Sequence, residues 1–440
     1  MRFGTDGVRG VANTELTAEF SLRLGRAAAR VLGTNGTVTT VVVGGDTRAS
    51  TPMLDAALSA GFAAEGIDVV RLGVVPTPMV AFVAQQLGAM GAMVSASHNP
   101  YHDNGIKLFA VGGTKLSDQV ESAIERELDA LQTPDAEPGV IHAVDESYVA
   151  PYVEHVTSRA TVGGADSLRI VIDAANGAAY MLVRDVFEHL GADVIVIGDS
   201  PNGTNINDAC GATAPDALAL AVREHGADLG IALDGDADRL IAVDHSGSIV
   251  DGDHIIAITA LDLLGRGLLR HQAVAVTSMT NLGFHLAMRA AGVDVVTTDV
   301  GDRYVLEALA KHDLVLGGEQ SGHVIFADHA STGDGMLTAV ALVDIVARSG
   351  HTLADLAQAA MTSLPQVLLN VRVAARVPDA VELLRDDIER AEQQLGDEGR
   401  VLVRASGTEP LVRVMVEAPT VELANAVAAD LAAVVRHRFH

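Results

Sequence analysis

The sequence has no tryptophan and a single cysteine, Cys210, among its 440 residues. One cysteine excludes an internal disulfide framework and any metal site built from several cysteines. Aromatic residues make up only 3% of the chain, whereas hydrophobic residues make up 49%. The core must therefore be built from Ala, Val, Leu and Ile, which suits buried parallel strands covered by alanine-rich helices.

Basic residues are scarce: 30 Lys and Arg stand against 57 Asp and Glu, so the formal net charge is −27. This balance argues against nonspecific binding to nucleic acid and against adhesion to anionic membranes. Long apolar runs are also missing, since none approaches the roughly 20 residues that span a bilayer. The N-terminus reads Met1-Arg2-Phe3-Gly4-Thr5-Asp6 and contains no apolar stretch. We therefore expect no signal peptide and a cytoplasmic protein.

Three segments share one pattern: an apolar strand, a polar turn, an amphipathic helix, a Gly-x-Asp tripeptide and a second strand. This order is typical of a βαβ unit in a parallel sheet. The tripeptides begin at Gly66, Gly191 and Gly292, which lie about a domain length apart. Their strands are expected at 41–43 and 66–70, 170–172 and 191–195, and 274–276 and 292–296. The alternative is one large α/β domain with generic βαβ repetition.

The last part of the chain has a different pattern. Strands are expected at 367–373, 401–404 and 411–416, and helices at 379–395 and 421–435. We therefore predict an α/β protein with three related α/β domains in series, with mixed or parallel sheets, and a smaller C-terminal α+β domain. The expected ranges are 1–150, 151–247, 248–363 and 364–440.

A dense polar loop over residues 95–107 follows the apolar run Ala92-Met93-Val94. It begins Ser95-Ala96-Ser97-His98-Asn99-Pro100 and ends at Lys107. A serine on a rigid loop can act as a nucleophile or phosphate carrier when a cation or base lies beside it. In isolation the motif could equally be an N-cap serine before an Asn-Pro turn.

The run Leu233–Arg239 holds three carboxylates, Asp234, Asp236 and Asp238. Their spacing predicts that they point to one side of an extended segment, where a divalent cation would relieve their repulsion. Oxygen ligands suit magnesium or calcium. A calcium EF-hand loop starting at Asp234 would need Gly and Glu where the sequence has Arg239 and His245. A magnesium site is therefore predicted, and a solvated acidic turn is the alternative.

Two further loops carry binding chemistry. Gly317–His323 offers a carboxylate at Glu319 and a hydroxyl at Ser321, which together can hold adjacent sugar hydroxyls. His323 could carry a proton near neutral pH. The run Arg404–Arg413 combines guanidinium groups, hydroxyls and a glycine, which are the components of an anion nest. Each of these could instead be an ordinary hairpin loop.

Together and in this order, the four loops resemble those of the α-D-phosphohexomutase superfamily, and the resemblance covers essentially the whole chain. The opening Phe3-Gly4-Thr5-Asp6-Gly7-Val8-Arg9-Gly10 and the run Glu319-Gln320-Ser321-Gly322-His323 look most like the bacterial branch that acts on glucosamine phosphates. The resemblance implies four domains around a central active-site cleft. It also implies a cytoplasmic isomerase of carbohydrate metabolism that interconverts glucosamine 6-phosphate and glucosamine 1-phosphate for amino-sugar nucleotide and peptidoglycan precursor synthesis.

The same resemblance implies a role for each motif residue. Ser97 would be the phosphoserine, and one Mg²⁺ would be held by Asp234, Asp236, Asp238 and the Ser97 phosphate. Lys107, Arg9 and Arg239 would lie near the reacting phosphate, and His323 would be a proton carrier. Glu319 and Ser321 would contact the sugar. The phosphate that is not reacting would be held by Arg404, Ser406, Gly407, Thr408 and Arg413.

Glucosamine 1,6-bisphosphate would be the intermediate, and it or a similar hexose bisphosphate the activator. We expect a hexosamine phosphate substrate, no nucleic-acid or membrane partner, and a monomer or homodimer. Two other functions stay open: a phosphomannomutase or phosphoglucomutase, and a non-catalytic sugar-phosphate-binding protein.

Overall fold

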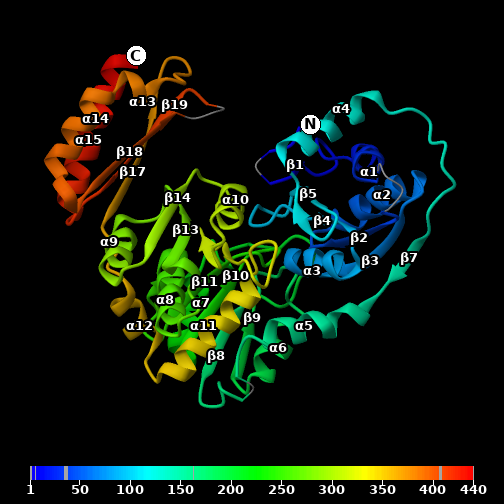
Figure 1. The fold of residues 1–440 in the computed structure, drawn as a ribbon, viewed down its shortest axis with the longest axis horizontal. Coiled ribbons are helices and arrows are strands. Elements are labelled where there is room, and N and C mark those ends of the chain that lie inside the picture. The colour runs from blue at the N-terminus through cyan, green and yellow to red at the C-terminus, as the bar shows by residue number, and fades with distance from the viewer. Residues whose placement is uncertain (1, 5, 34–37, 162, 406–408, 440) are drawn as a thin grey trace. The chain divides into compact units, whose positions relative to one another are not determined.

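The structure is a computed structural model that describes residues 2–4, 6–33, 38–161, 163–405 and 409–439. The chain forms two compact units. The first contains Met1–Met279 and Val293–Ala360, and the second contains Thr280–Gly292 and Met361–His440. Figure 1 shows the elements of both units coloured along the chain.

The first sheet lies in the N-terminal third of the chain. Its strands follow the order β1-β5-β4-β2-β3-β7, and β6 pairs with β5. The pairs β2–β3, β2–β4 and β3–β7 are parallel, whereas β5 runs antiparallel to β1, β4 and β6. The strands are β1 (Val8–Val11), β2 (Thr40–Gly45), β3 (Asp68–Val74), β4 (Met90–Val94), β5 (Asp103–Ala110), β6 (Thr114–Lys115) and β7 (Ile141–Val144).

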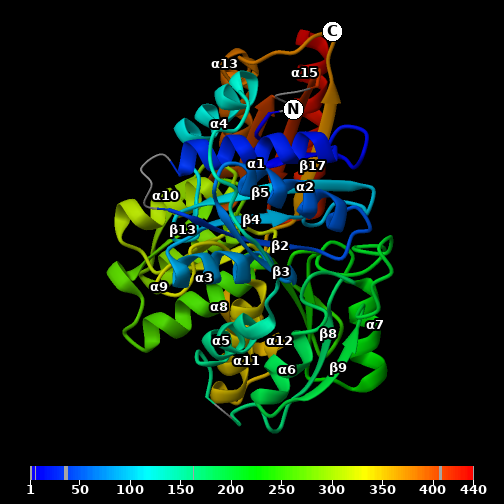
Figure 2. The same ribbon diagram turned by 90° about the vertical axis from the view of Figure 1, so that its right-hand side faces the viewer.

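Helices cover both faces of the first sheet: α1 (Ala18–Leu32), α2 (Thr51–Ala64), α3 (Thr77–Leu87) and α4 (Asp118–Ala130). Figures 1 and 2 both show α1 and α2 on one side of the strands and α3 on the other. Apolar residues of α1, α2 and α4, among them Leu24, Phe62 and Ile124, form one core cluster with the strands. Thr17 and Ser117 cap α1 and α4, since each side-chain oxygen accepts a hydrogen bond from a backbone N–H of the first turn.

The second sheet has the order β12-β11-β10-β8-β9, with β10–β8 and β8–β9 parallel and the other two pairs antiparallel. Its strands are β8 (Arg169–Asp173), β9 (Asp193–Ile197), β10 (Leu229–Leu233), β11 (Leu240–Asp244) and β12 (Ile249–Val250). Residues of α7 pack on it through a cluster that includes Leu218, Val222 and Val243. The helical segments before and within this region are η1 (Glu146–Tyr148), α5 (Val149–Thr157), α6 (Val183–His189) and α7 (Asp216–His225).

The third sheet has the order β14-β13-β15-β16, parallel except for the β15–β16 hairpin. Its strands are β13 (Ala273–Thr277), β14 (Asp294–Thr298), β15 (Leu316–Gly318) and β16 (Val324–Phe326). Val305 and Leu309 of α10 pack on these strands in one buried cluster. The helices of this part of the first unit are α8 (Gly252–Gly265), η2 (Arg270–Gln272), α10 (Asp302–His312), α11 (Gly335–Ser349) and α12 (Leu353–Ala360).

The second unit contains an antiparallel sheet of order β17-β19-β18, with β17 (Gln366–Arg372), β18 (Arg400–Ala405) and β19 (Leu411–Glu417). Val412, Val414 and Val416 of β19 pack against α15 in one buried cluster. The helix α9 joins this unit because the Leu282 N–H bonds to the buried Glu417 carboxylate at 2.9 Å. The helical segments are α9 (Leu282–Ala291), α13 (Ala380–Leu383), α14 (Arg385–Leu395), η3 (Gly396–Glu398) and α15 (Val421–Phe439).

The predicted fold class is confirmed, since mixed and parallel sheets are followed by a smaller antiparallel sheet with helices. The prediction of one helix over 379–395 is wrong, because α13 ends at Leu383 and α14 begins at Arg385. Leu384 between them has φ −104° and ψ 6°, and its side chain is fully buried in the core. The predicted domain limits stay a prediction.

Among the described residues, no single helix is long and apolar enough to cross a membrane. The helices α11 and α12 satisfy that test of length and composition only as a pair, which is bent by 98°. Most of the α11 residues are buried in the core.

Candidate active site

Ser97 lies on the serine loop, the segment Ser95–His102 between β4 and β5. Its side chain is buried, and its Oγ lies 2.5 Å from Oδ2 of Asp234, at the end of β10. Ser97 has φ 53°, a left-handed conformation that costs energy for a residue with a side chain. The surrounding contacts must therefore hold the serine in this conformation.

Those contacts come from two residues that the sequence analysis did not single out. The Arg48 guanidinium is fully buried and donates to the backbone oxygens of Ser97 at 3.0 Å and Asn99 at 2.8 Å. The Asn207 amide donates to the same two oxygens, at 2.9 Å and 3.2 Å. Asp46 accepts from Arg48 Nε at 2.8 Å and from Ser95 Oγ at 2.6 Å, so it joins the arginine to the start of the loop.

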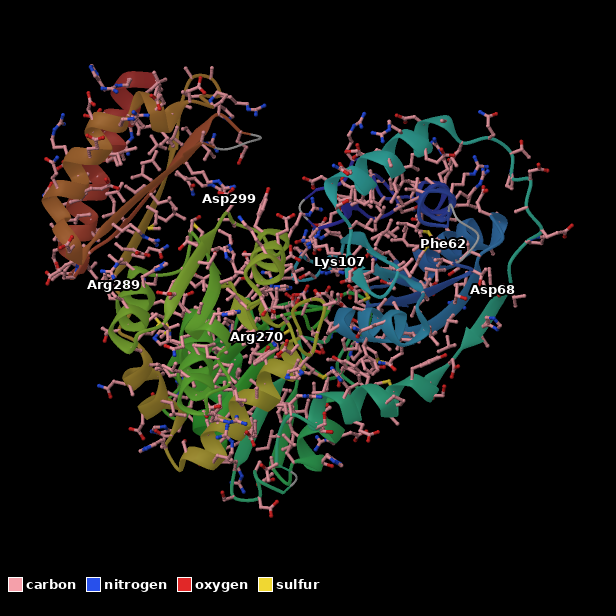
Figure 3. All side chains as sticks on the ribbon, viewed as in Figure 1. Phe62, Asp68, Lys107, Arg270, Arg289 and Asp299 are labelled. Carbon is pink, nitrogen blue, oxygen red and sulfur yellow. The ribbon has the colours of Figure 1, made fainter. Side chains whose placement is uncertain are left out.

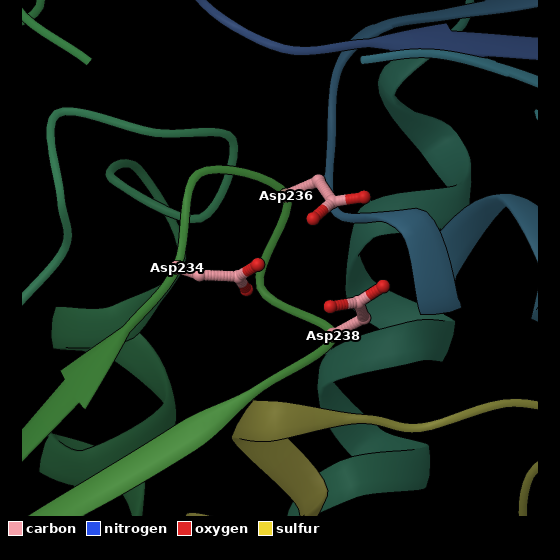
Figure 4. Close-up of side chains that lie close together, drawn as sticks. All are labelled: Asp234, Asp236 and Asp238. Atoms are coloured by element: carbon pink, nitrogen blue, oxygen red, sulfur yellow. The ribbon is translucent and has the colours of Figure 1, made fainter. Parts of the chain in front are cut away.

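The three aspartates lie on the aspartate turn, Asp234–Asp238, between β10 and β11. The expectation of an extended segment is wrong, because the Ala237 N–H bonds to the Asp234 oxygen at 3.0 Å and Ala237 has φ 57°. The turn still brings the carboxylates together: one oxygen from each lies within 4.8 Å of the others. Figure 4 shows the three carboxylates turned toward a common point.

The aspartate turn is a candidate site for a metal ion because its charge is buried and incompletely paired. All three aspartates are buried. Among the described residues, Oδ1 of Asp236 and Oδ1 of Asp238 have no hydrogen-bond partner. Burial and the neighbouring Asp238 and Asp236 carboxylates raise the pKa of Asp234 well above its usual value. Buried, unpartnered carboxylate oxygens are hard ligands of the kind that divalent cations bind, so the residues present fit a bound cation.

Lys107 was predicted to lie in the polar loop, but it is on strand β5, because the loop ends at His102. Its Nζ lies 2.8 Å from both Asp236 and Asp238 and 2.9 Å from Asp6. Although burial opposes the charged form, these carboxylates raise the pKa of Lys107 well above its usual value. Figure 3 labels the side chain where the first sheet meets the loops of the second and third sheets. Lys107 is therefore a fixed positive charge beside the aspartate turn.

Arg9 and Thr77 complete the side of the site that the first sheet provides. Arg9, on β1, donates to Oδ2 of Asp6 at 3.0 Å. Lys107 pairs with the same oxygen, so Asp6 lies between the two cations. Thr77, at the start of α3, donates through Oγ1 to Asp236 at 2.5 Å and through its N–H to the Asp236 backbone oxygen at 3.0 Å. The sequence analysis gave no role to Asp6, although it stands in the opening motif, and did not single out Thr77, which precedes the apolar run 79–84.

His98 lies beside the serine, with Nδ1 3.3 Å from Ser97 Oγ. Burial lowers the pKa of His98 to about 4, and the charges of Arg239 and Arg9 act in the same direction. The imidazole is therefore neutral at neutral pH and can exchange a hydrogen bond with the serine oxygen.

The glutamate loop, Glu319–Gly322, is the turn of the β15–β16 hairpin. The Gly322 oxygen accepts from the Leu240 N–H at 3.0 Å, so the loop is bonded to the first residue of β11. Gly322 has φ 90°, and a Cβ there would lie 2.0 Å from the Leu240 oxygen, which requires glycine. Glu319 accepts from the Gly301 N–H at 3.2 Å, while Ser321 is exposed.

Arg239 and His323 lie between the aspartate turn and the glutamate loop. The Arg239 N–H bonds to Oδ1 of Asp234 at 3.2 Å, and its Nε lies 3.8 Å from Asp238. His323 is buried. Lys107, and after it His323 and Arg239, lower the pKa of Asp238 against the effect of burial. The structure thus brings Ser97, Lys107, Arg239 and the three aspartates into one cluster. The glutamate loop is joined to the start of β11 beside it, and Ser321 is exposed.

The fourth loop belongs to the second unit. Arg404 on β18 and Arg413 on β19 are directly paired across the antiparallel strands, and both are exposed. Like charges directly opposite each other repel, which favours binding of an anion between or beside them. Ser406, Gly407 and Thr408 lie outside the described residues.

Sequence profiles of phosphoglucomutase/phosphomannomutase match four consecutive parts of the chain. They are α/β/α domain I at residues 1–135, α/β/α domain II at 150–247, α/β/α domain III at 251–364 and the C-terminal domain at 368–434. The chain belongs to the phosphoglucomutase/phosphomannomutase family.

Relatives within this family match nearly the whole chain. A phosphoglucosamine mutase of Frankia casuarinae is 54% identical, over 99% of this chain and 98% of the relative. A phosphoglucosamine mutase of Thermobifida fusca is 52% identical over the same shares. The crystal structure of a phosphoglucomutase/phosphomannomutase family protein from Burkholderia thailandensis has a TM-score of 0.81 at 25% identity, over 98% of this chain and 97% of that one.

Proposed function

We propose that the protein interconverts glucosamine 6-phosphate and glucosamine 1-phosphate and carries the transferred phosphoryl group on Ser97. The observation that carries this proposal is the 2.5 Å contact between Ser97 Oγ and the buried aspartate turn. Identity of 54% to a phosphoglucosamine mutase supports the choice of substrate within the family. The product would supply amino-sugar nucleotide and cell-wall precursor synthesis.

The metal ion in this proposal is one Mg²⁺, held by Asp234, Asp236, Asp238 and Ser97. The Oδ1 atoms of Asp236 and Asp238, which accept no hydrogen bond from any residue that the structure describes, support this assignment. When bound, Mg²⁺ supplies Lewis-acid neutralisation of charge on phosphate oxygens. Around it, Lys107, Arg9 and Arg239 provide the remaining positive charge, which is the main requirement of phosphoryl transfer.

The first transfer starts from phosphorylated Ser97. The bond between Ser97 Oγ and phosphorus breaks, and a bond forms between phosphorus and the 1-hydroxyl oxygen of glucosamine 6-phosphate. The hydroxyl proton passes to Ser97 Oγ, with His323 as the proposed proton carrier. Glucosamine 1,6-bisphosphate results, and no water or electron is consumed.

The second transfer reverses this chemistry at the other end of the sugar. The bisphosphate turns over, its 6-phosphoryl group returns to Ser97 Oγ, and the serine proton passes to the 6-oxygen. Glu319 and Ser321 hold sugar hydroxyls in both orientations. Arg404, Ser406, Gly407, Thr408 and Arg413 hold the phosphate that is not transferred, and the exposed arginine pair of β18 and β19 supports that role.

A bisphosphate activator follows from the same scheme, because an unphosphorylated Ser97 must first receive a phosphoryl group. Glucosamine 1,6-bisphosphate or a similar hexose bisphosphate can donate it. A cytoplasmic location and a monomeric or homodimeric state stay predictions.

The experiment is a substrate panel of glucosamine, glucose and mannose 6-phosphates, measured with Mg²⁺ and with or without glucose 1,6-bisphosphate. We expect kcat/KM for glucosamine 6-phosphate to exceed the others by at least about tenfold, because an ammonium group forms an ion pair with the Glu319 carboxylate and a neutral hydroxyl does not. A preference for mannose or glucose phosphate would identify a phosphomannomutase or phosphoglucomutase instead. No turnover of any sugar, with Ser97 unphosphorylated, would identify a binding protein.

A further inference from the structure

A chain of ion pairs links the glutamate loop to Lys107 through residues that have no role in the proposed function. It begins at Gly301, the N-cap of α10, whose N–H bonds to Oε1 of Glu319 at 3.2 Å. The next residue, Asp302, accepts hydrogen bonds through both carboxylate oxygens from Nζ of Lys115. Lys115 lies on β6 of the first sheet, so this pair joins the first and third sheets.

The chain continues from Lys115 into the candidate active site. Lys115 Nζ lies 3.3 Å from Oδ1 of Asp6, whose Oδ2 lies 2.9 Å from Nζ of Lys107. Asp6 therefore lies between the two lysines. Although burial opposes the charged form, the positive charges of Lys107, Lys115 and Arg9 lower the pKa of Asp6 well below its usual value.

The ion chain, formed by Asp302, Lys115, Asp6 and Lys107, is mostly shielded from solvent, and Asp6 is its most exposed member at 28%. The side chains of Lys115 and Asp302 are each only 14% exposed, and that of Lys107 is 5% exposed. They line a cavity of about 20 Å³ together with Asp6 and Thr332, which is room for about one water. Partial burial reduces screening by solvent, so these pairs hold their partners more firmly than surface pairs do.

A second ion pair supports the same junction. Arg303, next to Asp302, bonds to Asp118 and lies 2.7 Å from Glu121, both in the first turn of α4. Gly301 has φ 134° and ψ 138°, a conformation that suits glycine alone. The segment from Gly301 to Arg303 is thus held by the contact of Asp302 with β6 and by the contact of Arg303 with α4.

We propose that Lys115 is a positioning residue, which holds Asp302 and Asp6 so that Glu319 and Lys107 keep a fixed separation. This inference rests on the proposed function, in which Glu319 holds the sugar and Lys107 lies at the transferred phosphate. Loss of Lys115 would leave both groups present but misaligned, and misplacement by about 1 Å can reduce a transfer rate about 100-fold. Phosphorylation of Ser97 by a hexose bisphosphate uses the same site and should slow as well, but long incubation can bring it to completion before the transfer is measured.

The test uses Lys115→Met, which keeps most of the side-chain length and removes the charge. Protein is treated with glucose 1,6-bisphosphate, and intact mass gives the fraction carrying phosphate on Ser97. Glucosamine 6-phosphate is then added, and the rate of phosphoryl loss from Ser97 is measured in a single turnover. Steady-state KM and kcat are measured in parallel.

We expect Lys115→Met to reach the wild-type fraction of phosphoserine and to transfer at least about tenfold more slowly per phosphoserine. KM should change less than kcat, and Lys115→Arg should restore most of the rate, because a guanidinium can pair with both carboxylates. Asp302→Asn, which breaks the same pair without changing size, should lower the rate similarly. The double variant should lose no more than the worse single one, since the two residues act through one pair.

Arg71→Met is the matched control, because it breaks the ion pair between Arg71 of β3 and Asp55 of α2. Among the described residues, neither partner forms an ion pair with a member of the ion chain. Arg71→Met should transfer at the wild-type rate. The inference is overturned if Lys115→Met transfers normally per phosphoserine, or if Lys115→Arg transfers no faster than Lys115→Met. If wild-type protein itself transfers nothing from Ser97 to the sugar, the proposed function fails instead.

Discussion

At the scale of single residues, the site depends on Ser97 being held in a left-handed conformation with its oxygen against Asp234. The motif around Ser97 could be predicted from the sequence, because small hydroxyl residues, His and Asn-Pro stand together after an apolar strand. Arg48 could not, since nothing in the local pattern shows that a guanidinium will be buried beneath the loop and bonded to its backbone oxygens.

Ser97→Ala should lower mutase turnover by at least about 10³-fold, because it removes the hydroxyl that is proposed to carry the phosphoryl group. The Thr77 hydroxyl also lies at the aspartate turn, but it is bonded to Asp236 rather than to Asp234. The fold should persist, since the loop is held through backbone oxygens rather than through Ser97 Oγ. Turnover of glucosamine 6-phosphate and circular dichroism measure the two effects. Ser248→Ala, at an exposed hairpin, is the control and should keep full activity. Activity near the wild-type level in Ser97→Ala would refute the role of Ser97.

At the scale of elements, the start of α11 supports the aspartate turn. The Gly335 N–H bonds to the Ala237 oxygen at 2.9 Å, which fixes the left-handed residue between Asp236 and Asp238. Asp334 caps the helix through the Leu337 N–H at 2.9 Å and accepts from the buried Tyr152 hydroxyl at 2.9 Å. The spacing of the three aspartates predicted a shared metal site, but the turn could not be predicted, because a distant helix end stabilises it.

The buried Asp334 gives this element a pH dependence. Burial raises the pKa of Asp334 to about 6, so the protonated form is favoured in the folded state. Protonated Asp334 therefore contributes its full stabilisation below pH 3.8, which is the ordinary pKa of an aspartate. This contribution is lost as the pH rises through 6. Asp334→Asn keeps a cap and an acceptor for Tyr152 but cannot titrate.

We accordingly expect the free energy of unfolding of Asp334→Asn, relative to wild type, to increase as pH rises from about 4 to 7. Urea unfolding at a series of pH values measures the difference. A difference in unfolding free energy between the two proteins that stays constant from pH 4 to 7 would show that Asp334 does not titrate in this range.

The facing arginines of β18 and β19, Arg404 and Arg413, lead to a separate prediction for the second unit. Arg413→Gln should raise KM for glucosamine 6-phosphate by at least about tenfold, because one guanidinium of the proposed phosphate clamp is lost. It should also leave the fold as stable or stabilise it by about 0.2–1 kcal/mol, because repulsion with Arg404 is removed. Steady-state kinetics and thermal unfolding test both parts. An unchanged KM would exclude Arg413 from the clamp.

At the scale of the whole molecule, the architecture followed from patterns that repeat along the chain. The Gly-x-Asp tripeptides and their flanking strands predicted the βαβ units, and the parallel pairs β2–β3, β8–β9 and β13–β14 confirm them. The ion chain through Lys115 could not be predicted, because it joins residues more than a hundred positions apart in sequence. Such contacts depend on how the sheets pack, which local periodicity does not contain.

The positions of the acidic residues show how a protein of net charge −27 can bind an anion. Three of the acids are buried in the aspartate turn, and Asp6 and Asp302 hold the lysines of the ion chain. An acidic protein can therefore bind an anionic sugar phosphate, because some of its cations, among them Lys107 and Arg239, lie where phosphate is proposed to bind.

The central claim is that Ser97 passes its phosphoryl group to the sugar, and one measurement tests it most directly. Protein carrying isotopically labelled phosphate on Ser97 is mixed with a stoichiometric amount of glucosamine 6-phosphate and Mg²⁺, and the label is followed in protein and sugar. We expect the label to leave Ser97 and appear in glucosamine 1,6-bisphosphate as fast as turnover requires. Product formation while the label stays on the protein would contradict the account.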